Sequence, residues 1–137
     1  MYQVDAFASK LFSGNPAAVV IVESPLSEDL MQSIALENNL SETAFISINE
    51  SPIPIRWFTP TLEVNLCGHA TMASAKILFE HFPNISGNEI SFNSKSGILN
   101  VTQNAEDICL NFPADDPEPQ EMDALFAEAL GKSPIEI

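Results

Sequence analysis

The feature that most constrains the fold is residues 70–82, a segment of helical length that is apolar on nearly every side. Only Lys76 and Glu80 form a narrow polar stripe along it. A helix that is hydrophobic all round has to be buried, so the segment predicts a central helix covered by other elements. Its apolar positions are Met72, Ala73, Ala75, Ile77, Leu78, Phe79 and Phe82.

Short runs rich in β-branched and aromatic residues lie on both sides of this helix and predict strands. Ser27 predicts the start of a further helix, which ends at Asn38 and Asn39. We therefore expect an α+β domain in which a mixed or antiparallel sheet wraps around the central buried helix. The prolines that begin one strand favour an edge position for it. The predicted strands are residues 3–7, 17–22, 43–48 and 54–58, followed by "EISFN", "GILNV" and "DICLNF".

The composition changes near the end of the chain, at the proline-rich acidic stretch "PADDPEP". Residues 1–114 are expected to form one lobe of structure. Residues 115–137 are expected to be a connector followed by an amphipathic helix over about 119–130, which Gly131 ends.

Charge and hydropathy exclude several kinds of partner. The 137 residues carry a net charge of −14 and only five basic side chains, so nucleic acid and anionic membranes are not expected to bind. No apolar run reaches the roughly 20 residues of a membrane helix, and the first residues lack the pattern of a signal peptide. We therefore expect a cytoplasmic protein whose two cysteines, Cys67 and Cys109, are reduced thiols.

An anion site is predicted where the buried helix begins, at "LCGHAT" (residues 66–71). The first N–H groups of a helix lack partners and carry a partial positive charge. Gly68 allows close approach of a ligand to the backbone, and His69 and Thr71 add donors for a carboxylate or phosphate. The alternative interpretation is structural, with Gly68 in a tight turn and Thr71 or His69 capping the helix.

A candidate acid/base lies in a second segment, "LSETAF" (residues 40–45). Ser41 and Glu42 stand at the start of an apolar strand, which would place the Glu42 carboxylate near the centre of the fold. Partial burial makes a glutamate usable as a general acid/base near neutral pH. The alternative interpretation of Glu42 is a solvated turn residue.

Together these segments resemble the phenazine-biosynthesis PhzF-like isomerase family. The matching stretches are "GNPAAVV", "LSETAF", "FTPTLEV", "LCGHAT" and "ICLNFPA", which stand in the family's order and extend over nearly the whole chain. Their combination is specific, although each stretch alone would be a weak signal.

The resemblance implies a fold like that of diaminopimelate epimerase, with two similar lobes and an active site between them. This chain resembles the N-terminal lobe only. By resemblance, Glu42 matches the catalytic acid/base that moves a proton between two carbons of a small carboxylate. Gly68 and His69, with Ala70 beside them, match substrate-binding positions, and Asn15 and Ser41 are expected next to them. No cofactor and no metal are implied.

Three other interpretations remain open from the sequence. Cys67 could act as a thiol base, as in related racemases and epimerases, although Cys109 reads as a core residue rather than a second catalytic thiol. Cys67, His69, His81 and Cys109 could bind zinc, although their spacing is unusual for such a site.

The third interpretation is a truncated lobe that binds a ligand or dimerises without turnover, because the second lobe's catalytic aspartate has no counterpart here. The expected partner is a second copy of the chain, which forms a homodimer with the first. In it, a second copy would replace the missing lobe and cover apolar surface that a lone lobe exposes.

Overall fold

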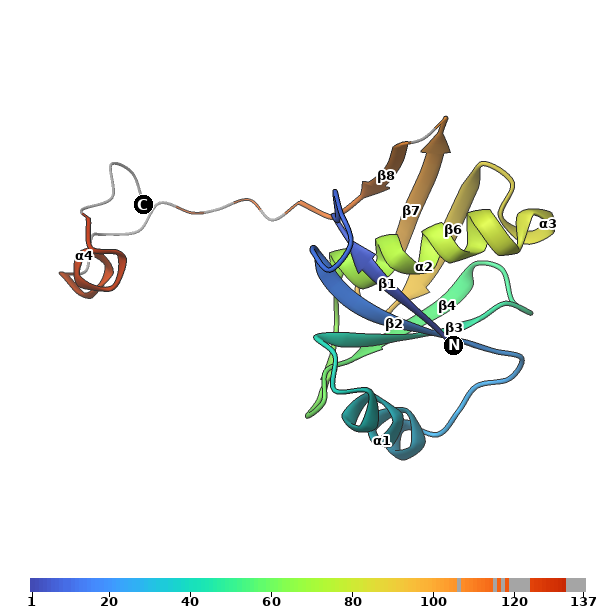
Figure 1. Cartoon of the computed structure of the whole chain (residues 1–137), viewed down its shortest axis with the longest axis horizontal. Helices are drawn as coiled ribbons and strands as arrows, with labels where there is room; N and C mark the ends of the chain where they lie inside the picture. Colours follow the sequence, from blue (N-terminus) through green and yellow to red (C-terminus); the bar gives the residue numbers. More distant parts are fainter. Residues whose placement is uncertain (106, 115, 117, 119–123, 133–137) are drawn as a thin grey trace.

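The computed structural model describes residues 1–105, 107–114, 116, 118 and 124–132, and its strands form one mixed sheet. Figure 1 shows this sheet curving around the long helix α2. The strand order is β1-β2-β3-β4-β6-β7-β8, and β5 pairs with β4 beside this path. The strands are β1 (Tyr2–Ala6), β2 (Asn15–Val22), β3 (Glu42–Ser47), β4 (Ile53–Phe58), β5 (Glu63–Val64), β6 (Glu89–Ser94), β7 (Gly97–Asn104) and β8 (Asp107–Asn111).

The sheet is mixed because two of its pairings are parallel. β2 runs parallel to β3, and β4 runs parallel to β6, whereas the other neighbours are antiparallel. The parallel β2–β3 pair is connected through α1, as parallel neighbours require. The helices are α1 (Glu28–Asn38), α2 (Gly68–His81), α3 (Pro83–Ser86) and α4 (Ala124–Leu130).

Helix α2 occupies the concave side of the sheet, which confirms the predicted central buried helix. It packs against β1 and β2 at one end of the strand order and against β7 and β8 at the other, so the sheet has to curl around it. Ala70, Ala75 and Leu78 have no exposed surface at all. The core that α2 shares with the strands includes Trp57, Phe92, Leu99 and Val101.

Helix α1 covers the opposite face of the same sheet. Ser27 caps it as predicted, accepting a hydrogen bond from the Leu30 N–H, and a left-handed Asn39 ends it. A second, smaller core lies beneath α1 and contains Met31, Ala35, Phe45 and Phe58. Because β3 is covered on both faces, all of its residues after Glu42 are buried.

Two expectations from the sequence are wrong. The proline-containing strand β4 lies inside the sheet, between β3 and β6, rather than at an edge. Pro54 is tolerated there because the β3–β4 register begins only at Ile55, after the proline. On its other side, Pro54 pairs with Asn93 of β6 in a parallel contact two residues long. Cys109 is exposed on β8 and is not a core residue, because its neighbours Ile108 and Leu110 take the inward positions of the strand.

The predicted C-terminal helix is present over Ala124–Leu130, and the residues 119–123 of that prediction lie outside the described part of the chain. Gly131 follows it with a positive φ of 66°, as expected of a glycine at a helix end. Among the described helices, none has the length and apolar character needed to cross a membrane.

Candidate functional site

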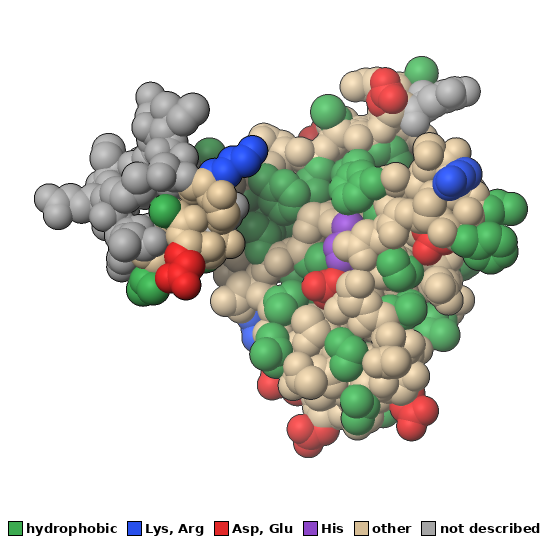
Figure 2. Space-filling model, turned by 60° about the vertical axis from the view of Figure 1, so that its left-hand side comes forward, with side chains coloured by type: hydrophobic (Ala, Val, Ile, Leu, Met, Phe, Trp, Pro, Cys, Tyr) green, Lys and Arg blue, Asp and Glu red, His purple; other side chains and the backbone are tan. Residues whose placement is uncertain are grey.

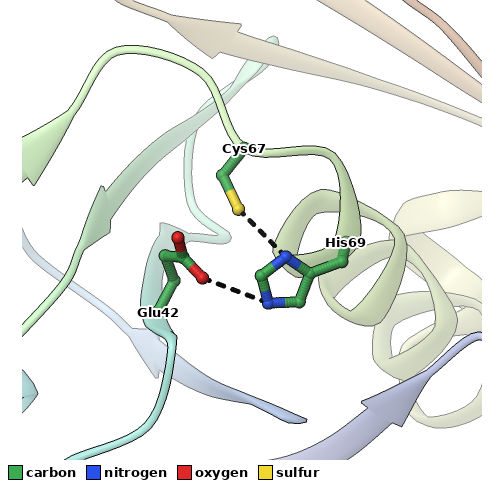
Figure 3. A group of neighbouring side chains, drawn as sticks. All are labelled: Glu42, Cys67 and His69. Carbon is green, nitrogen blue, oxygen red and sulfur yellow. Dashed lines mark hydrogen bonds and ion pairs between the residues drawn. The ribbon is translucent and has the colours of Figure 1, made fainter. Parts of the chain in front are cut away.

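The first residue of β3 and the first turn of α2 meet at one end of the sheet, and this junction forms the candidate site (Figure 3). Glu42 opens β3 and is held in register with Ala17 of the parallel neighbour β2. Cys67 is the N-cap of α2, and His69 lies in its first turn. The buried helix and the buried strand therefore bring segments 25 or more residues apart in the sequence into contact.

The His69 imidazole lies between the other two side chains of the cluster. Its Nε2 atom is 3.3 Å from Glu42 Oε2, and its Nδ1 atom is 3.4 Å from Cys67 Sγ. His69 and Cys67 are 9% and 8% exposed, and the Glu42 side chain is 21% exposed. The cluster thus places a carboxylate, an imidazole and a thiol together in a largely dry environment.

Two polar atoms of this cluster have no properly aligned hydrogen bond. Glu42 Oε2 and His69 Nε2 are both buried and lie within ion-pair distance, but their orientation does not satisfy hydrogen-bond geometry. Native proteins rarely leave buried polar atoms unsatisfied, and such exceptions concentrate at functional sites. Both atoms therefore retain hydrogen-bonding capacity that their mutual contact does not use.

The Cys67 thiol is poorly suited to act as a base. Burial raises its pKa to about 11, and the nearby Glu42 charge contributes in the same direction. The backbone amides of Ala70 and His69 oppose this shift only in part. The thiol is therefore protonated at neutral pH, despite its position at a helix N-terminus.

Gly68 lies beneath an aromatic ring that the sequence did not reveal as part of the site. A Cβ atom at Gly68 would stand 3.1 Å from two ring carbons of Phe112, so the glycine allows the ring to approach the start of α2. Phe112 is 38% exposed and follows β8. The only sequence signal for it was its place in the "ICLNFPA" stretch.

Asn15 and Ser41 lie side by side where β2 and β3 begin. Ser41 donates a hydrogen bond of 2.9 Å from its hydroxyl to Asn15 Oδ1, which joins the start of β2 to the residue before Glu42. Thr71 is fully buried, and its hydroxyl donates to the Cys67 carbonyl at 2.5 Å. Thr71 therefore does not cap the helix, because its hydroxyl is engaged within α2.

The four-residue zinc site considered from the sequence does not form. His81 stacks on the Tyr2 ring at the far end of α2, with ring centroids 5.2 Å apart, and Cys109 is exposed on β8. The spacing along the chain already weighed against this site, because α2 separates its two ends by the length of a 14-residue helix.

The cluster is distinct from a hollow of about 530 Å³ between β1, α2 and the start of β8. That hollow is lined mainly by apolar side chains, together with Asp5, Lys76 and Asp107, and contains none of the three cluster residues. Figure 2 shows a histidine beside an acidic side chain on an open face where the neighbouring surface is mostly hydrophobic or uncharged.

Comparison with known proteins agrees with this architecture. The sequence profile of the phenazine biosynthesis-like protein family (PhzC-PhzF) matches residues 4–135. An uncharacterized isomerase of Pseudomonas aeruginosa is 46% identical over 136 residues, which are 99% of this chain and 52% of that protein. A human phenazine biosynthesis-like domain-containing protein is 40% identical over 147 aligned positions, covering 99% of this chain and 51% of its own.

The fold is also found among solved structures. A PhzF-family phenazine biosynthesis protein from Enterococcus faecalis superposes with a TM-score of 0.88 at 46% identity, over 98% of this chain and 52% of that one. The chain spans about half the length of the curated relatives it matches. Because both its sequence and its fold match those of the family, the chain belongs to the PhzF-like phenazine biosynthesis family.

Proposed function

We propose that this chain carries the acid/base half of a cofactor-independent isomerase, in which Glu42 transfers a proton between two carbons of a small carboxylate substrate. The observation that carries the proposal is the buried, unaligned Oε2 atom of Glu42 beside the first turn of α2. The isomerase names of the relatives favour the same reaction class.

The start of α2 is suited to bind the carboxylate of the substrate. The first hydrogen bond of the helix runs from the Thr71 N–H to the Cys67 carbonyl, at 3.3 Å. The N–H groups of Gly68, His69 and Ala70 precede that bond, so the helix itself does not use them. Helix N-termini bind anions through such groups. Asn15 and Ser41 supply further polar atoms on the β2–β3 side.

Glu42 is the proposed base and subsequent acid. It takes a proton from a carbon next to an electron-withdrawing group, and the electron pair of the broken C–H bond delocalises into that group. The same carboxyl then returns the proton to another carbon, which completes the isomerisation without a change in oxidation state. His69 holds the carboxylate in place through its contact of 3.3 Å.

A thiol mechanism is the second candidate, because Cys67 lies 3.4 Å from His69 and within the same cluster. The raised pKa of Cys67 weighs against it, since a protonated thiol is a poor base. The two mechanisms make opposite predictions for a Cys67→Ser variant, which keeps the size of the side chain but removes the thiol.

We propose further that a second copy of the chain covers the site in a homodimer and brings a second Glu42 toward it. Asn15, the first residue of β2, borders the site, and the loop before it exposes Phe7, Leu11 and Phe12 by 76%, 85% and 98%. Apolar side chains gathered on one loop favour a contact surface. Light scattering at micromolar concentration tests this, and a mass of one chain at all concentrations would contradict it.

The function is tested by solvent deuterium incorporation. A panel of small carboxylic acids is incubated with the protein in D₂O, and exchange at carbon is followed by NMR. We expect exchange into one structural class of acids, lost in Glu42→Gln and retained in Cys67→Ser. Loss in Cys67→Ser alone would support the thiol mechanism. Binding without exchange in any acid would support a ligand-binding lobe without turnover.

A further inference from the structure

We infer that Glu42, Cys67 and His69 together form a binding site for a borderline-soft divalent cation such as Zn²⁺. Nothing in the fold or the family comparison assigns a metal to this chain. Cation binding does not depend on the proposed isomerase activity, but the inhibition that we expect from it rests on that proposed function. An occupied site would hold the Glu42 carboxylate on the metal and so prevent proton transfer.

The donor atoms are of the kinds that zinc prefers in proteins. The cluster offers one thiol sulfur, one imidazole nitrogen and one carboxylate oxygen, and a donor atom from each side chain lies within 4.8 Å of the other two. Zinc binds these donors at about 2.0–2.3 Å, and three protein ligands leave a fourth position open. The mixture of sulfur, nitrogen and oxygen donors favours Zn²⁺ over Mg²⁺ or Ca²⁺.

The distance between the Cys67 and His69 donor atoms already fits two ligands of one zinc ion. Two ligand atoms on one tetrahedral zinc ion stand about 3.3–3.8 Å apart, given those bond lengths. Cys67 Sγ and His69 Nδ1 are 3.4 Å apart, on two residues of one rigid helix start. The third donor, from Glu42, lies within 4.8 Å of the other two and has to move toward them to complete the set.

Burial and the unpaired atoms distinguish this cluster from a chance group of polar side chains. His69 is only 9% exposed. Its Nε2 atom has no aligned hydrogen bond, and neither has Glu42 Oε2. A bound cation relieves the deficit at the carboxylate, by ligating Glu42.

Three of the five basic side chains of the chain are already paired with carboxylates. Arg56 and Lys95 are tied to Glu63, and Lys76 is paired with Glu80 on the polar stripe of α2. The chain as a whole carries a charge of −14, which raises the local concentration of cations near its surface. Zinc itself removes the proton from a coordinating thiol, so the protonated Cys67 of the free protein is compatible with ligation.

Two probes test the site directly on the 137-residue chain. Zn²⁺ is titrated in competition with a chromophoric chelator to give a stoichiometry and an affinity. Co²⁺ is titrated separately, because a thiolate ligand produces a charge-transfer absorption in the near ultraviolet that oxygen ligands do not. We expect one ion per chain in the first experiment and the thiolate band in the second.

The chain offers matched controls, because it has two cysteines and two histidines and only one of each lies in the cluster. Cys67→Ser and His69→Gln are expected to weaken Zn²⁺ binding by about 100-fold or more, and Glu42→Gln by about 10-fold. Cys109→Ser and His81→Gln are expected to leave it within about twofold. Far-ultraviolet circular dichroism and the thermal transition confirm that each variant is folded.

Several outcomes would overturn the inference. One is a Co²⁺ complex of the unaltered chain without the thiolate band, a result that needs no variant to fold. Another is equal weakening by Cys67→Ser and Cys109→Ser, which would indicate nonspecific thiol binding. Zinc binding without inhibition of deuterium exchange would remove only the functional consequence, and binding without any exchange activity would leave the site standing while contradicting the isomerase.

Discussion

Glu42 and Glu63 are two largely buried carboxylates near the same sheet, and their surroundings are opposite in kind. The Glu63 side chain, 10% exposed, accepts hydrogen bonds of 2.7 Å from Arg56 Nε and 2.7 Å from Arg56 Nη2, and it also pairs with Lys95. Glu42, 21% exposed, contacts His69 at 3.3 Å without hydrogen-bond alignment.

The difference separates a structural carboxylate from the proposed acid/base. The Arg56 guanidinium binds Glu63 through two parallel bonds, the strong form of such a pair, and also reaches Glu28 of α1 at 2.8 Å. This network ties β4, β5 and α1 together. The Glu42 cluster leaves donor and acceptor capacity unused, which contributes little to stability and suits the proposed ligand binding.

The largest expected effect contrasts the two residues in catalysis. Glu42→Gln should lower the rate of deuterium exchange by about 10²–10⁴-fold, the usual contribution of a general acid/base. Glu63→Gln should change that rate by less than about threefold once the variant is shown to be folded. Comparable losses in both variants would mean that Glu42 acts through the fold rather than on the substrate.

The same two variants should rank in the opposite order when their loss of folding stability is compared. Glu63→Gln is expected to lower the free energy of unfolding by about 1–3 kcal/mol, because it leaves the partly exposed Arg56 with fewer charge-assisted bonds. Glu42→Gln should change it by less than about 1 kcal/mol, since an unaligned contact is lost together with a desolvated charge. Urea denaturation at pH 7 measures both, and a larger loss in Glu42→Gln would contradict the comparison.

The stabilisation by Glu63 should disappear in acid. Hydrogen bonding from Arg56 lowers the pKa of Glu63 below its usual value of 4.5, although burial opposes this, and Lys95 lowers it further. A carboxyl whose pKa is lower in the folded state stabilises the fold above its unfolded pKa and loses that effect as the pH falls through the folded value. The stability difference between the unaltered chain and Glu63→Gln should therefore be complete above about pH 5 and shrink progressively below it. Urea denaturation at a series of pH values measures this, and a difference that does not change with pH would show that the charge of Glu63 is not responsible.

The smallest expected effect belongs to the outer cation of the network. Lys95 is 51% exposed, so Lys95→Met should lower the free energy of unfolding by less than about 1 kcal/mol. Thermal denaturation at low salt and in about 1 M NaCl measures it, and the difference should vanish at high salt because exposed ion pairs are screened. A salt-independent loss would instead indicate that packing of the lysine side chain matters.

Part of the candidate site could be identified from the sequence because local motifs report local geometry. Residues 68–71 were recognised as the start of a buried helix, and Glu42 was recognised as the start of an apolar strand. The resemblance to the PhzF-like family then placed both in one site. Phe112 was missed because an aromatic residue after a strand has no local property that shows which glycine its ring will cover.

The positions of the two cysteines show the same limit of prediction from sequence. Both stand in apolar surroundings in the sequence, but Cys67 is 8% exposed at the start of α2 while Cys109 is exposed on β8. Side chains of a strand alternate between its faces, and the pairing partner decides which face is inward. In β8 that choice places Ile108 and Leu110 on the core.

The sequence by itself determined the elements of this protein, because a buried helix and covered strands require continuous apolar patterns that can be read along the chain. It also determined the chemistry available, by placing Glu42, Cys67 and His69 at the ends of those elements. Only the tertiary structure decided that β4 lies inside the sheet, that Arg56 satisfies Glu63, and that the His69 imidazole stands between a carboxylate and a thiol. These are contacts between distant segments, and they are fixed by how the sheet curls around α2 rather than by any local pattern.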